Sequence, residues 1–174
     1  MSDSEHTGLR GAIDRAADAM GGLAGKGAAG MTTGGSKFVE RAVNGNRYEL
    51  QAAAIALKRS RSEAVRAFAQ RMKADHTTAH HQMACTLQSI PDAPEPPAEL
   101  DSRHGQMIDH LEKASDDDFD QRYLEQQDLA HQETAELLDT FATQGDDPRL
   151  VMFARGTVPT VKRHLEHVRR LRNG

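Results

Sequence analysis

The sequence predicts an all-α protein built around a bundle of four long helices. Aromatic residues make up 4% of the chain and Trp is absent, which favours a core of Leu, Ala, Val and Met over a β-sandwich. Four segments repeat apolar residues about every 3.5 positions, the period of helices packed side by side in a bundle. Tight turns or a proline-rich stretch separate these segments, so each is expected to be one helix.

The first two helices are predicted over residues 36–58 and 60–90. The letters "NGN" at 44–46 are a helix-breaking signal inside the first of them. Ser60 and Glu63 have the spacing of a capping box at the start of the second, which ends before Pro91. The tight turn between the two helices predicts an antiparallel hairpin.

The other two long helices are predicted to form a second hairpin. The third begins in the acidic run "SDDDFD", where negative charge suits the positive end of the helix dipole, and ends near Gly145. The fourth has Asp147 as its N-cap and Pro148 at its first helical position, and continues to about residue 172. A proline-rich stretch and a short helix over 99–114 are expected to form the crossover between the hairpins.

The segment 1–36 differs in composition from the bundle expected over 37–172. It holds nine of the 14 glycines, so it is predicted to bury too little apolar surface to order and to form a mostly disordered tail. Acidic residues stand where a signal peptide has its positive region, which predicts a cytoplasmic protein. No apolar run is long enough to cross a bilayer.

Charge and cysteine content narrow the classes of partner. The formal net charge is -4 and the pI is about 6.1, so there is no basic field for nucleic acid. Cys85 is the only cysteine, which excludes an intramolecular disulfide. A monomer or weak dimer is expected, with the N-terminal tail available to a protein or envelope partner.

Each long helix carries one polar residue of a metal-ligand type in its apolar seam. These residues are Glu49, His76, His131 and His164. Within each hairpin the two residues differ in depth from the turn by only about 4–5 Å, at a rise of about 1.5 Å per residue. The four are therefore expected to share one layer at mid-bundle, where a carboxylate and three imidazoles suit a single Zn, Fe or Cu ion.

The same layer has a purely structural interpretation, which stays open. Buried polar groups cost about 1–3 kcal/mol unless hydrogen-bonded, so Glu49 could accept protons from the histidines and fix the register of the helices. Three neighbours are weaker candidates for the site. His80 lies one helical turn after His76, and Asp75 and Asp128 have the spacing to orient an imidazole from behind.

Three stretches of the chain together resemble a bacterial family. They are "NRYELQAAAIALKRSRSEAVRAFAQRMKADHTTAH", "FDQRYLEQQDLAHQETAELLDTF" and "DDPRLVMFARGTVPTVKRHLEHVRRL". The features that carry the resemblance are Glu49, "FA" then "M" and "DH" in the second helix, "FD…Y" and the histidine of the third, and "P" then "H" in the fourth. Over about residues 37–172 the chain resembles the ferritin-like four-helix family of unknown function often labelled "predicted outer membrane protein". The resemblance implies a ferritin-like bundle, no established reaction, and a periplasmic or envelope location.

The chain departs from the di-iron pattern of ferritins, which needs Glu-x-x-His on two helices. Lys73 precedes His76 by three residues and Val161 precedes His164 by three, so a metallo-oxidoreductase is the least favoured function. The expected function is a non-enzymatic bundle that binds a metal or small ligand in stress or metal homeostasis. The alternative is a structural or interaction protein that binds no metal.

Overall fold

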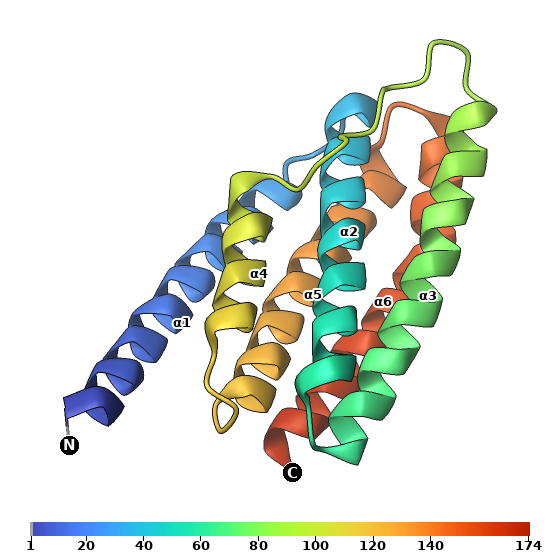
Figure 1. Cartoon of the computed structure of the whole chain (residues 1–174). Coiled ribbons are helices and arrows are strands. Elements are labelled where there is room, and N and C mark those ends of the chain that lie inside the picture. The colour runs from blue at the N-terminus through green and yellow to red at the C-terminus, as the bar shows by residue number, and fades with distance from the viewer. Residues whose placement is uncertain (1) are drawn as a thin grey trace.

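The computed structural model describes residues 2–174, which form six α-helices and no strand (Figure 1). The helices are α1 (Ser2–Ala29), α2 (Gly35–Arg59), α3 (Glu63–Gln88), α4 (Ser102–Lys113), α5 (Phe119–Gln144) and α6 (Pro148–Asn173). The predicted all-α class is therefore confirmed, and α1 is a helix beyond those expected from the sequence. Within the described range, none of the helices has the length and apolar character needed to cross a membrane.

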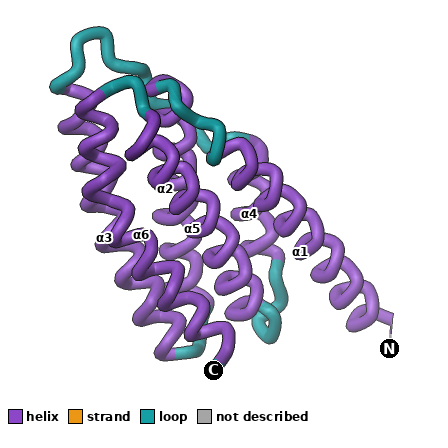
Figure 2. The backbone as a smooth tube through the Cα atoms, turned by 180° about the vertical axis from the view of Figure 1, so that it is seen from behind, coloured by secondary structure: helices purple, strands orange, loops and turns teal. Residues whose placement is uncertain are grey.

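Four of the helices, α2, α3, α5 and α6, pack around a common centre. α2 contacts α3 and α5, and α6 contacts the same two neighbours, so the four run side by side in both views (Figures 1 and 2). Short turns at 60–62 and 145–147 join α2 to α3 and α5 to α6. α4 lies against α2 and α5, and α1 lies along α5 on the outside of the group.

Caps fix where the helices begin, and one of them differs from the expected one. Asp147 caps α6 as predicted, because its carboxylate accepts from the backbone N–H groups of Arg149 and Leu150. The cap of α3 is Ser62, whose hydroxyl accepts from the N–H of Val65. Ser60, predicted to open this helix, instead ends α2, so the expected capping box does not form.

The "NGN" signal does not interrupt α2, because both asparagine side chains make hydrogen bonds that support the helix or its neighbours. Asn44 donates to the carbonyl of Glu40 in the preceding turn and accepts from the N–H of Asp101, the N-cap of α4. Asn46 accepts from His76 of α3. Contacts to other helices thus outweigh the local preference of these residues for turns.

The buried apolar side chains form two clusters. The Tyr48 cluster includes Phe68, Met72, Ala130 and Val168, and the Phe38 cluster includes Val43, Met83, Ala135 and Val161. Each of α2, α3, α5 and α6 contributes to both clusters. The histidines of α3, α5 and α6 lie between the two contributions of their helices, and Glu49 of α2 directly follows Tyr48. Close packing on both sides therefore holds the polar layer at a fixed height.

Residues 1–36 were expected to be mostly disordered, and the structure differs by placing 2–29 in α1 against α5. Glycines allow the close approach of the two helices. A Cβ at Gly22 would lie 3.1 Å from the side chain of Leu129, and one at Gly25 would meet the carboxylate of Glu133. The buried guanidinium of Arg122 also donates to Asp14 at 3.0 Å. Composition alone gives no sign of such pairings, since they join residues far apart in the sequence.

Replacing Asp18 with alanine is expected to lower the free energy of unfolding by about 1–3 kcal/mol. Asp18 is buried in α1 and accepts from Gln126 at 2.7 Å and from His110 at 2.8 Å, so the substitution leaves two donors unpaired. Asp109→Ala is the matched control, because the pair of Asp109 with Lys113 is exposed and should be worth at most about 1 kcal/mol. Urea unfolding measures both, and equal losses would contradict a stabilising role for the α1 contacts.

Candidate metal centre

Three of the predicted site residues come together at the centre of the four helices. His76 of α3, His131 of α5 and His164 of α6 are 7%, 1% and 3% exposed. One ring nitrogen from each lies within 4.8 Å of the corresponding nitrogens of the other two. Counting residues from the two turns therefore placed these histidines in one layer correctly. Their role as metal ligands stays a prediction.

Each imidazole uses one of its ring nitrogens to donate a hydrogen bond away from the cluster. The pairs are His76 Nδ1 with Asn46 Oδ1 (2.9 Å), His131 Nδ1 with the Gln127 carbonyl oxygen (2.8 Å), and His164 Nε2 with Asp75 Oδ2 (2.8 Å). All three partners are oxygens that accept, so the nitrogen facing each of them carries the proton. In a neutral imidazole the other nitrogen then carries a lone pair.

The remaining ring nitrogens of the three histidines face one another. His131 Nε2 lies 3.3 Å from His164 Nδ1, so two neutral rings bring two lone pairs to hydrogen-bonding distance. His76 Nε2 is buried and has no hydrogen-bond partner among residues 2–174. Three lone pairs in a buried space are unfavourable unless a proton or a metal ion lies among them.

Two of the three imidazoles do not carry a second proton at neutral pH. Burial, followed by the neighbouring His131 and His164, holds the pKa of His76 well below its usual value. Burial and His131 lower the pKa of His164 to about 4, against the opposing effect of the Asp75 carboxylate. His76 and His164 are therefore neutral at pH 7, and their free nitrogens are available to a metal ion.

Glu49, the fourth predicted ligand, lies in the same layer but on the far side of His131. Its Oε1 is 3.5 Å from His131 Nδ1, the ring nitrogen opposite the cluster, and its Oε2 accepts from Gln127 Nε2 at 2.7 Å. Burial raises the pKa of Glu49, while His131 and Gln127 partly offset this rise. Glu49 is thus placed to support His131 from behind, as carboxylates do in metal sites.

The weaker candidates lie in three different environments. Asp75 supports an imidazole as expected, but that imidazole is His164 rather than its neighbour His76. Asp128 pairs with Arg169 and Arg172 and does not reach the layer. His80 is exposed at the edge of a cavity beside His76.

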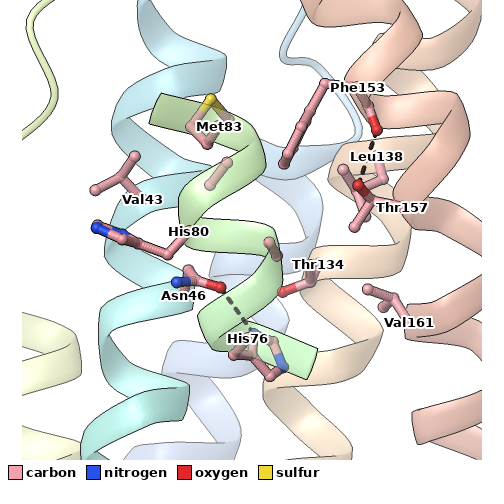
Figure 3. Close-up of a pocket in the computed structure, with 12 residues that line it drawn as sticks. Val43, Asn46, His76, His80, Met83, Thr134, Leu138, Phe153, Thr157 and Val161 are labelled. Atoms are coloured by element: carbon pink, nitrogen blue, oxygen red, sulfur yellow. Dashed lines mark hydrogen bonds between the residues drawn. The ribbon is translucent and has the colours of Figure 1, made fainter. Parts of the chain in front are cut away.

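Sequence reasoning missed two residues that orient the histidines. Asn46 was interpreted only as part of a helix-breaking signal, and Gln127 was given no role in the site. Figure 3 shows Asn46 of α2 bonded to His76 of α3. A signal was present in the spacing, since Asn46 precedes Glu49 by three residues and Gln127 precedes His131 by four, so each pair shares a helix face.

Comparison with known proteins gives one match. A family model described as "Domain of unknown function (DUF4142)" matches residues 22–171, a span that begins within α1 and includes the whole histidine cluster. No curated protein and no solved structure matches the chain.

Proposed function

This chain belongs to the family of the domain of unknown function DUF4142, and we propose that it binds one divalent transition-metal ion through His76, His131 and His164. The observation that carries the proposal is the 3.3 Å approach of two nitrogens, His131 Nε2 and His164 Nδ1, whose opposite ring nitrogens both donate to oxygen acceptors. Ligating histidines in proteins almost always make such outward hydrogen bonds. Zn(II) accepts three imidazoles at about 2.0–2.1 Å, with a further position open.

The structural alternative requires the same residues to be satisfied without a metal. A hydrogen bond between His131 and His164 would need one extra proton in the buried layer. The pKa of His164, lowered to about 4 by burial and by His131, keeps that proton off the His164 ring at neutral pH. Without a metal, each unpaired buried nitrogen costs about 1–3 kcal/mol, so the arrangement favours metal binding over a polar layer alone.

The ligand set favours one ion rather than two. Among the described residues, the convergent group consists of three histidines and holds no carboxylate, whereas di-iron sites in ferritin-like bundles need several. Imidazole ligands suit Zn, Cu and Fe. A ferritin-like core of α2, α3, α5 and α6 is part of the proposal, supported by the two hairpins and the long crossover through α4. Such a protein fits a non-enzymatic role in metal homeostasis.

Purified full-length protein without a histidine tag is expected to bind one equivalent of Zn(II). Because the cluster exists only in the folded state, metal at about 100 times its Kd should add about 2.7 kcal/mol to the free energy of unfolding. Elemental analysis gives the stoichiometry, and thermal melts with Zn(II) and with chelator give the stabilisation. Identical melts in Zn(II), Cu(II), Fe(II) and chelator would leave only the structural alternative.

A further inference from the structure

Helix α1 packs on the rest of the protein through its polar side. Two of its carboxylates face α5: Asp14 accepts from Arg122 at 3.0 Å, and the buried Asp18 accepts from Gln126 at 2.7 Å. A Cβ at Gly22 would lie 3.1 Å from a side chain of the same helix. A helix at a protein surface normally buries its apolar side and exposes its polar side, so the orientation of α1 is the reverse of the usual one.

The apolar side of α1 faces outward. Among the side chains that the structure describes, five large apolar ones are exposed, and four of these are on α1 or directly after it: Ile13, Met20, Leu23 and Met31. Ile13, Met20 and Leu23 are 60%, 73% and 71% exposed. Figure 2 shows α1 at the edge of the molecule, with the other helices on one side of it. Apolar side chains gathered on one exposed face indicate a contact surface.

The outward residues repeat with the period of a contact between two helices. Ile13, Ala16, Met20, Leu23 and Gly27 are all exposed, and they follow one another by three, four, three and four residues. We call these five residues the α1 stripe. Spacings that alternate between three and four give the narrow seam along which two helices pack. A Cβ at Gly27 would meet nothing within 4 Å, so this position leaves open space beside the large side chains.

The spacing and the charge of the stripe favour a protein helix over a lipid surface. Between Arg10 and Lys26, a stretch that the structure describes throughout, the exposed side chains carry no charge. Helices that lie on membranes have a polar face rich in Lys and Arg, whereas the polar side of α1 is engaged by α5 and the chain has a net charge of -4. A lipid surface also sets no requirement on helical spacing, so the alternating pattern indicates another helix.

The stripe is complementary to itself when two copies run antiparallel. With Met20 opposite Met20 of the second copy, Ile13 lies opposite Gly27, and Leu23 lies opposite Ala17. Each large side chain away from the centre then faces a small one, as a knob faces a hole. The same patch serves both copies, which is the property of a twofold symmetric interface.

Charge distinguishes this antiparallel pair from a parallel one. A parallel pair would bring together the Arg10 side chains of the two copies, and likewise their Lys26 side chains. In the antiparallel pair the two Lys26 residues are separated by about 18 Å along the helix axis, at a rise of about 1.5 Å per residue. Like charges are thus kept apart at opposite ends of an uncharged contact.

We propose that two copies of this chain form a twofold symmetric dimer through antiparallel α1 stripes. A single pair of helices is at the lower end of specific interfaces, below about 1,200 Å² of buried surface, so the dimer is weak, with a Kd of about 10 μM. The stripe lies outside the histidine cluster, and measurements in chelator therefore test the dimer separately from metal binding.

Sedimentation equilibrium of the full chain, in chelator and reducing agent, measures the association. Wild type is expected to change from monomer to dimer between about 1 and 100 μM. Met20→Glu should weaken the dimer at least about tenfold, because it places two like charges opposite each other at the twofold axis. Met152→Glu is the matched control, since Met152 lies on α6 and is 72% exposed, and it should keep the Kd within about threefold of wild type. Circular dichroism checks the fold, and Leu23→Glu replaces Met20→Glu if that variant loses helix.

Disulfide cross-linking tests the antiparallel arrangement, in a chain whose exposed Cys85 is replaced by serine. Met20→Cys should cross-link with itself, because the two residues face each other at the twofold axis. Leu23→Cys should cross-link with itself at least about tenfold less, because six residues, about 9 Å along the axis, separate the two positions, beyond the reach of a disulfide of about 7 Å. A mixture of Leu23→Cys with Ala17→Cys should restore the cross-link. Equal self-cross-linking at positions 20 and 23 would indicate a parallel pair and overturn the proposed arrangement.

Two further results would overturn the dimer itself. Wild type that stays monomeric at about 200 μM would exclude a second copy as the partner. Binding of that monomer to phosphatidylglycerol vesicles, lost in Met20→Glu, would then assign the stripe to a lipid surface. Equal dissociation constants for Met20→Glu and Met152→Glu would place the contact elsewhere on the protein.

Discussion

Replacing His131 with alanine is expected to abolish binding of one equivalent of metal. His131 supplies one of the three nitrogens of the cluster, in which the ring centroids lie 5.3 Å (His131 to His164) and 5.7 Å (His76 to each of the others) apart. Even residues that only orient a ligand are worth about 10–100-fold in metal affinity, so loss of a ligand should cost more than about 100-fold. Competition with a chromophoric chelator measures the affinity of wild type and variant for Zn(II).

The control for this variant is His81→Ala, which removes an exposed histidine from α3 and should leave the affinity unchanged. His131→Ala should also lose about 2–4 kcal/mol of stability in chelator, because it opens a cavity and removes a neighbour of Glu49. That loss of stability is expected with or without a metal site, so it does not discriminate between a metal site and a purely structural polar layer. The informative result is the metal response: melts of the variant in Zn(II) and in chelator should superimpose, and a variant that still binds one equivalent at wild-type affinity would exclude His131 as a ligand.

The parts of the fold that the sequence predicted are those encoded by local signals. The seams of α2, α3, α5 and α6 repeat within each helix, and Asp147 with Pro148 marks the start of α6 in adjacent residues. The parts that it missed depend on pairs distant in sequence. Asp14 reaches Arg122 across 108 residues, and the burial of α1 depends on that pairing and on glycines that face α5.

The candidate site shows the same division between local and distant information. Counting residues from a turn gives the height of a side chain along the bundle, and it placed Glu49 and the three histidines in one layer. Such counting does not predict which ring nitrogen of a histidine faces a given neighbour. Glu49 lies beside Nδ1 of His131, the nitrogen that faces away from the cluster. Adjacent helical residues also point about 100° apart, so Asp75 reaches His164 on α6 while His76 points into the cluster.

Acid is expected to destabilise the metal-free protein between pH 6.5 and pH 4. The groups that act on the His164 ring are His131 of α5, Asp75 of α3 and Arg163 of its own helix, with His76 close by. Burial and His131 lower the folded-state pKa of His164 to about 4, so in this window the unfolded chain binds the proton and the folded chain does not. The contribution of His164 is therefore complete above pH 6.5 and is lost as the pH falls towards 4, a loss on the order of 3 kcal/mol.

Other groups of the layer titrate in the same range, so a variant is needed to isolate His164. The pKa of His76 is lowered mainly by burial and adds to the acid loss, whereas the pKa of Glu49 is raised by burial, so its protonation at low pH favours the folded state. Urea unfolding in chelator from pH 7 to pH 4 should show a smaller acid loss for His164→Gln than for wild type, by on the order of 3 kcal/mol. His81→Gln should follow wild type.

Parallel curves for wild type and His164→Gln would mean that His164 takes up its proton in the folded protein. In that case the proton would lie between His164 Nδ1 and His131 Nε2, which are 3.3 Å apart, and the layer would be satisfied without a metal. A smaller acid loss in the variant instead means that the folded protein keeps this space free of protons at the cost of its own stability. The lost stability arises from the same ring nitrogens that a metal ion would bind. The pH dependence of the unfolding free energy of the metal-free protein therefore tests the proposed site before any metal is added.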